Sequence, residues 1–233
     1  MDSIEEILQY YMEWCKIAES TEYRNANQNK KDEIRLQHDA DAKYFKGLGY
    51  DDATALRGDV IISFWTIYQT LLKNEARWRV YKTQKSLTAL KAQIEKQGDY
   101  YAKICEVNKM LSELSKVCYE RCNYMLLPNG ARAMNNQRYQ FVEDRIDATV
   151  FQCFGKGVLA KFFTSDDDVI AWVKSQKLNM LFDGEICAEN IKWLTTNSQR
   201  PILISEMDTK ELMQYVGNVI EFLRNREAEL AKA

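Results

Sequence analysis

Histidine, proline and glycine are scarce in this chain, whose 233 residues include one histidine, two prolines and nine glycines. Because proline and glycine interrupt regular structure, their scarcity favours helices over a fold of many strands. The single histidine, His38, is followed by Asp39 and Asp41, but metal-dependent hydrolases that use a His-Asp pair need further histidines. Serine–histidine and cysteine–histidine nucleophile pairs are also not expected. We interpret His38 as a surface residue beside two carboxylates.

Long hydrophobic runs are also missing. The longest uncharged, apolar-rich stretch, residues 60–72, has 13 residues, whereas a membrane-spanning helix needs about 20. The N-terminus carries Asp2, Glu5 and Glu6 instead of the basic start of a secretory signal. The sequence therefore predicts a cytoplasmic protein that does not associate with membranes, with six cysteines that are reduced thiols.

The composition is ordinary for a soluble globular protein, with 46% hydrophobic and 28% charged residues and a net charge of −2. The longest helical signal spans residues 99–121. Gly98 and Asp99 form a helix stop followed by a cap, so residues 83–97 are expected to fold back as an antiparallel partner. Lysines and glutamates alternate along one face of residues 99–121. The opposite face carries apolar residues at spacings of three or four: Ile104, Val107, Leu111, Leu114, Cys118 and Cys122.

We therefore predict a mainly α fold, a helical bundle built on this antiparallel hairpin, with at most a small sheet in the C-terminal half. That sheet would be made from extended segments near residues 124 and 202, and residues 20–31 would form a polar loop or a frayed helix end. Further helices are predicted at residues 4–19, 32–45, 52–72 and 141–154, after Ser165 and from Asp208 onward.

Two questions of architecture stay open. Residues 148–163 fit either a helix as far as Phe154 or a hairpin around Gly155 and Gly157. The chain divides into a helical region, residues 1–121, and a helical or α+β region, residues 122–233, or it forms one continuous domain.

A basic segment at residues 73–96 carries seven basic and two acidic residues, interleaved with aromatic side chains. Positive charge mixed with stacking surfaces can hold single-stranded nucleic acid. The alternative is an ordinary solvated helix face whose aromatic rings turn to the core. The candidate nucleic-acid-binding residues are Lys73, Arg77, Trp78, Arg79, Tyr81, Lys82 and Lys85.

A polar cluster near the middle of the chain is the candidate binding surface, and its members are Asn135, Arg138, Asp144, Arg145 and Asp147. Asp144 and Asp147 are three residues apart and share a helix face, while Arg145 points away from that face and can reach inward to a buried carbonyl or carboxylate. The cluster is therefore either a ligand site or a structural ion-pair network in which Arg138 pairs with Asp144 or Asp147.

Other polar patterns favour structure over chemistry. Gly58-Asp59 resembles part of the magnesium site of all-α nucleotide pyrophosphatases, but Leu56 stands where a second carboxylate is needed. Cys118 and Cys122 lie one helical turn apart, which fits core packing, and the aspartates at 166–168 fit a helix N-terminus. We predict no metal and no cofactor.

Three segments carry a resemblance to a known family: Asn123-Tyr124-Met125-Leu126-Leu127-Pro128, Met134-Asn135-Asn136-Gln137-Arg138 and Asp144-Arg145-Ile146-Asp147-Ala148-Thr149. They resemble an uncharacterised family of bacterial and phage-associated proteins, which implies a compact, largely helical protein of unknown function. The first segment also resembles the end of some HNH-type restriction nucleases, whose catalytic histidines are missing here.

The predicted function is a non-catalytic protein-binding or regulatory module with an unidentified protein partner. One alternative is a nucleic-acid-binding protein that uses residues 73–96. Another is an enzyme with a carboxylate-based site that the sequence does not reveal.

Overall fold

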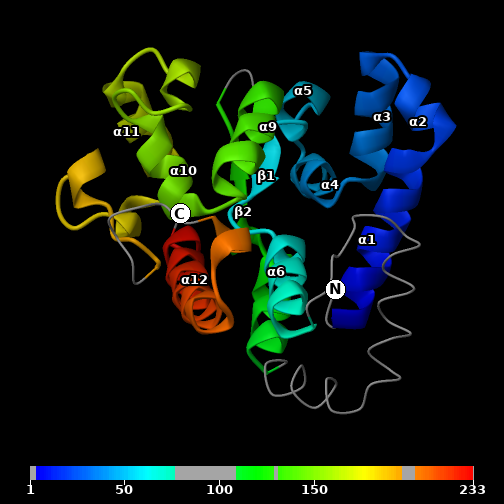
Figure 1. The fold of residues 1–233 in the computed structure, drawn as a ribbon. Coiled ribbons are helices and arrows are strands. Elements are labelled where there is room, and N and C mark those ends of the chain that lie inside the picture. Colours follow the sequence, from blue (N-terminus) through cyan, green and yellow to red (C-terminus); the bar gives the residue numbers. More distant parts are fainter. Residues whose placement is uncertain (1–3, 77–108, 129–130, 196–202, 233) are drawn as a thin grey trace.

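The computed structural model describes residues 4–76, 109–128, 131–195 and 203–232. Within these residues the chain is mainly helical and contains a two-stranded antiparallel sheet, which confirms the predicted fold class. The sheet lies near the centre, with α1 to α3 on one side of it and α10 to α12 on the other (Figure 1).

Short helices that are joined by polar caps make up the N-terminal part. They are α1 (Ile4–Glu19), α2 (Thr21–Asn25), α3 (Gln28–His38), α4 (Ala40–Gly47) and α5 (Asp52–Ala55). The side chains of Ser20 and Asn27 accept hydrogen bonds from backbone N–H groups at the starts of α2 and α3. The predicted loop at residues 20–31 is therefore largely helical, and the prediction of a loop there is wrong.

Asp39 splits the helix that was predicted at residues 32–45. Its backbone is extended, and its side chain accepts a hydrogen bond from Asp41 N at the start of α4. One residue thus ends α3 and caps α4, because a cap side chain competes with the continuing helix for backbone donors.

The sheet pairs β1 (Gly58–Val60) with β2 (Tyr124–Leu126), and Asp59 lies opposite Met125. The strand predicted near residue 124 is confirmed, and its partner among the described residues is β1. The predicted segment near residue 202 lies partly outside the described residues, and Ile204–Glu206, just after it, form a 3-10 helix. The helix predicted at residues 52–72 is interrupted by β1 and resumes as α6 (Phe64–Ala76). Of the strand residues, Val60 is β-branched and suits the extended backbone.

The C-terminal part contains α9 (Ala131–Val142), α10 (Ile146–Cys153), α11 (Asp166–Ser175) and α12 (Thr209–Leu230). Glu143 and Asp144 have positive φ angles of 49° and 61°, so the chain turns sharply between α9 and α10. The helix predicted from residue 141 therefore begins at Ile146. The hairpin alternative for residues 148–163 is wrong, since α10 is followed by the 3-10 helix Ala160–Phe162.

One cluster of buried side chains runs from Ile7 in α1 to Leu223 in α12 and includes residues on both sides of position 121. Residues 109–118 are helical, and their buried side chains include Leu111, Leu114 and Cys118, whereas Lys109 is exposed. This part of the predicted apolar face is confirmed as core. The rest of the hairpin, residues 83–97 and 99–108, lies outside the described residues.

Candidate functional site

Arg138, in α9, is fully buried and joins four segments of the chain. Its Nη1 lies 2.6 Å from Asp59 Oδ2 and 3.2 Å from Asp144 Oδ1. Its Nη2 donates to Ile61 O at 2.8 Å, and its Nε donates to Thr149 Oγ1 at 2.9 Å. Desolvation favours the neutral guanidine, but the two carboxylates hold the pKa of Arg138 above its usual value. Arg138 therefore stays charged and fixes β1 against α9 and α10.

Arg145 and Asp147 form a second buried pair. Arg145 Nη2 lies 2.8 Å from Asp147 Oδ2, and both side chains are 0% exposed. Asp147 Oδ2 also accepts a hydrogen bond from Leu194 N at 2.9 Å. The Arg145 guanidinium lies 5.9 Å from the ring centre of Trp193 and 5.5 Å from that of Tyr215. Arg145 thus reaches inward to a carboxylate, and the pair is closed to solvent.

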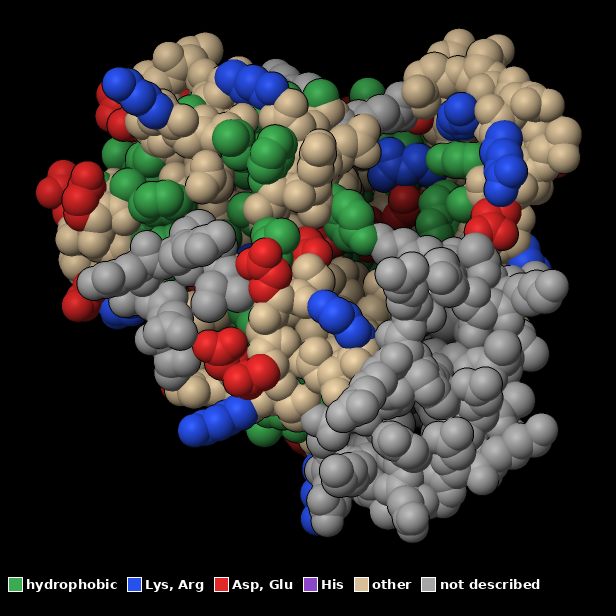
Figure 2. All heavy atoms as spheres, in the orientation of Figure 1, with side chains coloured by type: hydrophobic (Ala, Val, Ile, Leu, Met, Phe, Trp, Pro, Cys, Tyr) green, Lys and Arg blue, Asp and Glu red, His purple; other side chains and the backbone are tan. Residues whose placement is uncertain are grey.

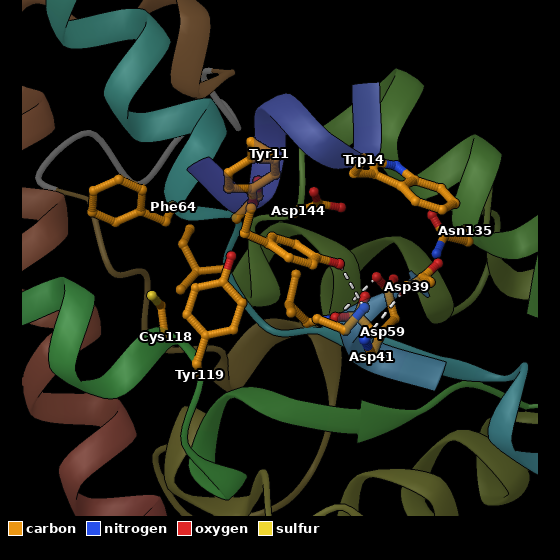
Figure 3. A pocket seen from close by; sticks show the side chains of 15 residues that line it. Tyr11, Trp14, Asp39, Asp41, Asp59, Phe64, Cys118, Tyr119, Asn135 and Asp144 are labelled. Atoms are coloured by element: carbon orange, nitrogen blue, oxygen red, sulfur yellow. Dashed lines mark hydrogen bonds between the residues drawn. The ribbon is translucent and has the colours of Figure 1, made fainter. Parts of the chain in front are cut away.

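Two residues of the predicted polar cluster, Asn135 and Asp144, border a cavity of about 200 Å³, here called the inner chamber. Asn135 and Asp144 line it together with three further carboxylates, from Asp39, Asp41 and Asp59. Figure 3 shows Asp39, Asp41 and Asp59 gathered on one side of this cavity, with Asn135 beside them. The structure therefore joins part of the predicted polar cluster to the carboxylates that surround the α3–α4 junction and β1.

Aromatic rings form the other walls of the inner chamber, from Tyr10, Tyr11 and Trp14 of α1 and from Tyr119. The ring centres of Tyr10 and Tyr119 are 6.0 Å apart, in an edge-to-face arrangement. The Tyr10 hydroxyl accepts a hydrogen bond from Ala40 N at 2.6 Å and lies 3.1 Å from His38 O, which ties α1 to the α3–α4 junction. Burial raises the pKa values of Tyr10, Tyr11 and Tyr119, so these phenols stay neutral.

Asp41 differs from the other carboxylates of the inner chamber. Asp39 pairs with Arg35 Nε at 3.0 Å, and Asp59 and Asp144 share Arg138. The Asp41 carboxylate forms no hydrogen bond or ion pair with any residue that the structure describes. Desolvation, followed by the charges of Asp39 and Asp59, raises the pKa of Asp41 well above its usual range. Four carboxyl groups thus face two guanidinium groups, so Asp41 has no positive charge to favour its ionised form.

A second cavity of about 480 Å³, here called the outer chamber, adjoins the first and shares Trp14, Asp39 and Asn135 with it. Its other lining residues include Lys31 and Arg57. In the space-filling view a hollow lies between the α2–α3 corner and the centre of the molecule, and both acidic and basic side chains are visible inside it and at its rim (Figure 2). The two chambers therefore differ in the sign of their charge.

Most residues of the two chambers were not predicted as site residues from the sequence. Sequence reasoning considered Asp39, Asp41 and Asp59 only as incomplete metal sites and gave no role to the aromatic residues of α1. The available signal was the group Tyr10, Tyr11 and Trp14, which lie within five positions on one helix. Nothing in the sequence shows that this helix packs beside the α3–α4 junction.

The structure describes only some of the residues predicted to bind nucleic acid or metal. Lys73 Nζ donates to Ser205 O at 2.8 Å, and the other six predicted nucleic-acid-binding residues lie outside the described part of the chain. Cys118 and Cys122 are buried in the core. Across the residues that the structure describes, no group of three or more His, Cys, Asp or Glu side chains is arranged to hold a metal ion.

Comparison with protein-family models, curated proteins and solved structures gives no match to this chain. The resemblance to the bacterial and phage-associated family therefore stays a prediction. Of the helices within the described ranges, none is both long enough and apolar enough to cross a membrane.

Proposed function

We propose that the chain is a non-catalytic binding module whose inner chamber holds the ammonium group of a small organic cation. The observation that carries this proposal is the Asp41 carboxylate, which faces an aromatic-walled cavity with no partner among the described residues. A bound ammonium group would supply the missing positive charge and donate charge-assisted hydrogen bonds to the carboxylates.

The walls of the inner chamber favour an organic cation over a metal ion. The faces of tyrosine and tryptophan rings attract cations, and Tyr10, Tyr11, Trp14 and Tyr119 all line the cavity. Carboxylates alone would also suit a hard metal ion, but the carboxylates among the described residues lack a metal-binding arrangement. An aliphatic ammonium group can interact with both the carboxylates and the faces of the aromatic rings.

The proposal keeps two predictions made from the sequence, a cytoplasmic location and a non-catalytic role, and adds a small-molecule ligand. The protein partner stays a prediction. Nucleic-acid binding also stays a prediction, since six of its seven candidate residues lie outside the described part of the chain. The alternative of a carboxylate-based enzyme draws support from the raised pKa of Asp41, because buried carboxyl groups with a strongly raised pKa occur often among catalytic acids and bases.

Titration calorimetry with ethanolamine tests the proposal, with ethylene glycol as the uncharged analogue. We expect ethanolamine to bind and ethylene glycol not to bind, because only the amine brings a positive charge. Asp41→Asn should weaken ethanolamine binding more than tenfold. Asp183→Asn removes the same charge from a side chain that is 86% exposed and lies outside both chambers, and it should leave binding unchanged. Equal binding of the two compounds, or full binding by Asp41→Asn, would refute the proposal.

The pH dependence follows from the raised pKa of Asp41. Because an ammonium group favours the ionised carboxyl, binding at a pH below this pKa must release a proton, and affinity must fall as the pH is lowered through it. The stability of the free protein changes with pH in the opposite direction to the affinity, because the folded state holds the Asp41 proton more tightly than the unfolded state. Stability then falls as the pH rises from the ordinary carboxyl range towards the raised pKa. Asp41→Asn removes this effect and should raise the melting temperature at neutral pH, as expected for a residue kept for function.

A further inference from the structure

The outer chamber contains two cationic side chains that no described carboxylate neutralises. The Lys31 ammonium lies 5.8 Å from the centre of the Tyr23 ring and has no ion pair with a described residue. Arg57 Nε donates to Leu127 O at 2.9 Å, and its two terminal nitrogens have no partner within the described chain. The third cation of this chamber, Arg35, is already paired with Asp39. Two positive charges therefore face the space that leads to the acidic inner chamber.

We infer that the ligand is a primary amine that also carries a phosphate monoester, with its ammonium group in the inner chamber and its phosphate in the outer chamber. This inference rests on the proposed function and adds the second half of the ligand. A phosphate monoester carries a charge of about −1.5 to −2 at pH 7, which matches Lys31 and Arg57 together. A carboxylate, with a single negative charge, would leave one of them uncompensated.

The sizes of the chambers support a ligand that spans both. Pockets for small molecules usually measure about 300 to 1,000 Å³. The inner chamber, at about 200 Å³, holds only a small group, whereas the outer chamber, at about 480 Å³, falls within this range. Trp14, Asp39 and Asn135 line both spaces, so the chambers meet along these three side chains.

The polar groups of the outer chamber suit a phosphate. Because Leu127 O holds its Nε, the Arg57 guanidinium is oriented before a ligand arrives, and its two terminal nitrogens match the paired donors that phosphate oxygens accept. The Asn135 and Asn136 side chains also line this chamber and offer amide donors. Asn135 belongs to the polar cluster predicted from the sequence, and it stands where the two halves of the ligand would join.

A matched set of ligands tests the inference, and titration calorimetry gives their affinities. The set consists of ethanolamine, phosphoethanolamine, β-alanine and inorganic phosphate. We expect phosphoethanolamine to bind at least tenfold more tightly than ethanolamine, β-alanine or inorganic phosphate. The double substitution of Lys31→Gln with Arg57→Gln should lower the ratio of phosphoethanolamine affinity to ethanolamine affinity at least tenfold. Lys30→Gln removes a neighbouring charge of α3 that pairs with Glu33 outside both chambers, and it should leave this ratio unchanged.

The outcomes separate this inference from the proposed function. If ethanolamine binds and phosphoethanolamine binds no better, the inference fails and the proposed function stands. If β-alanine binds as tightly as phosphoethanolamine, the assignment of a phosphate is overturned. If inorganic phosphate binds as tightly as phosphoethanolamine and Asp41→Asn changes neither affinity, the two chambers do not share one ligand. If neither amine binds, the proposed function fails as well.

Discussion

Replacement of Arg138 by methionine tests whether the buried network holds the fold together. Methionine keeps a flexible aliphatic side chain in the same space, so the change mainly removes the charge and the donors. Asp59 and Asp144 would then lose a shared partner at 2.6 and 3.2 Å, and Ile61 O and Thr149 Oγ1 would each lose a donor. Asp59 is 4% exposed and Asp144 is 7% exposed, so water cannot fully replace the guanidinium.

Removal of one partner from a buried ion pair costs about 3 to 5 kcal/mol, because the other charge stays buried without compensation. For a chain of this length that loss corresponds to a fall in melting temperature of roughly 6 to 20 °C. Arg224→Met is the matched control, since Arg224 pairs with Glu113 at 2.6 Å but is 60% exposed. An exposed pair contributes about 0 to 1 kcal/mol, so the control should unfold close to the wild type.

Urea unfolding, followed by circular dichroism, measures both variants. The loss in Arg138→Met should shrink at acid pH, because protons can neutralise Asp59 and Asp144 when the guanidinium is gone. It should also shrink when Asp59→Asn and Asp144→Asn are already present, because the network residues act together. If Arg138→Met costs no more than Arg224→Met, the reasoning that makes Arg138 a structural residue is refuted.

Two further predictions concern the core and the second buried pair. Leu111→Ala should cost about 2 to 5 kcal/mol in urea unfolding, because it leaves a cavity at a fully buried position, whereas Lys109→Ala on the exposed face should cost less than about 0.5 kcal/mol; equal losses would contradict the assigned faces. Arg145→Ala should lower the melting temperature by several degrees in a thermal scan, because it leaves Asp147 buried without its partner, and an unchanged melting temperature would show that the pair does not stabilise the fold.

Local signals in the sequence predict much of the secondary structure. Ser165 and Asp208 precede helices, and their side chains accept hydrogen bonds from the N–H groups of Asp168 and Glu211, as their positions suggested. The apolar spacing around Leu111 and Leu114 also identified the buried face. These features depend on residues within one or two turns of each other, so the sequence alone contains the information.

The errors arose where a distant segment decides the backbone. Residues 58–60 were included in a helix predicted from a cap near Asp52 and an apolar centre at residues 60–72, but their backbone groups pair with β2, which lies more than sixty positions away. The local pattern gave no signal of this pairing, because it depends on a segment far away in the sequence. The site depends on the same pairing, because it places Asp59 beside Arg138, 79 positions further along. Asn135, Arg138 and Asp144 could therefore be recognised from the sequence as polar candidates. The carboxylates and aromatic rings that complete the inner chamber could not.

The double role of Asp39 as the end of α3 and the cap of α4 has a consequence for binding affinity. Asp39 Oδ1 accepts from Asp41 N at 3.1 Å, and Oδ2 accepts from Arg35 Nε at 3.0 Å, so this carboxylate has one fixed orientation before any ligand arrives. A side chain that is already ordered loses little rotamer entropy on association, and each such side chain otherwise costs about 0.5 to 1.5 kcal/mol. At Asp39 that entropy is lost during folding, where the cap and the ion pair offset the loss. A small ligand that contacts Asp39 therefore does not have to order this side chain when it binds.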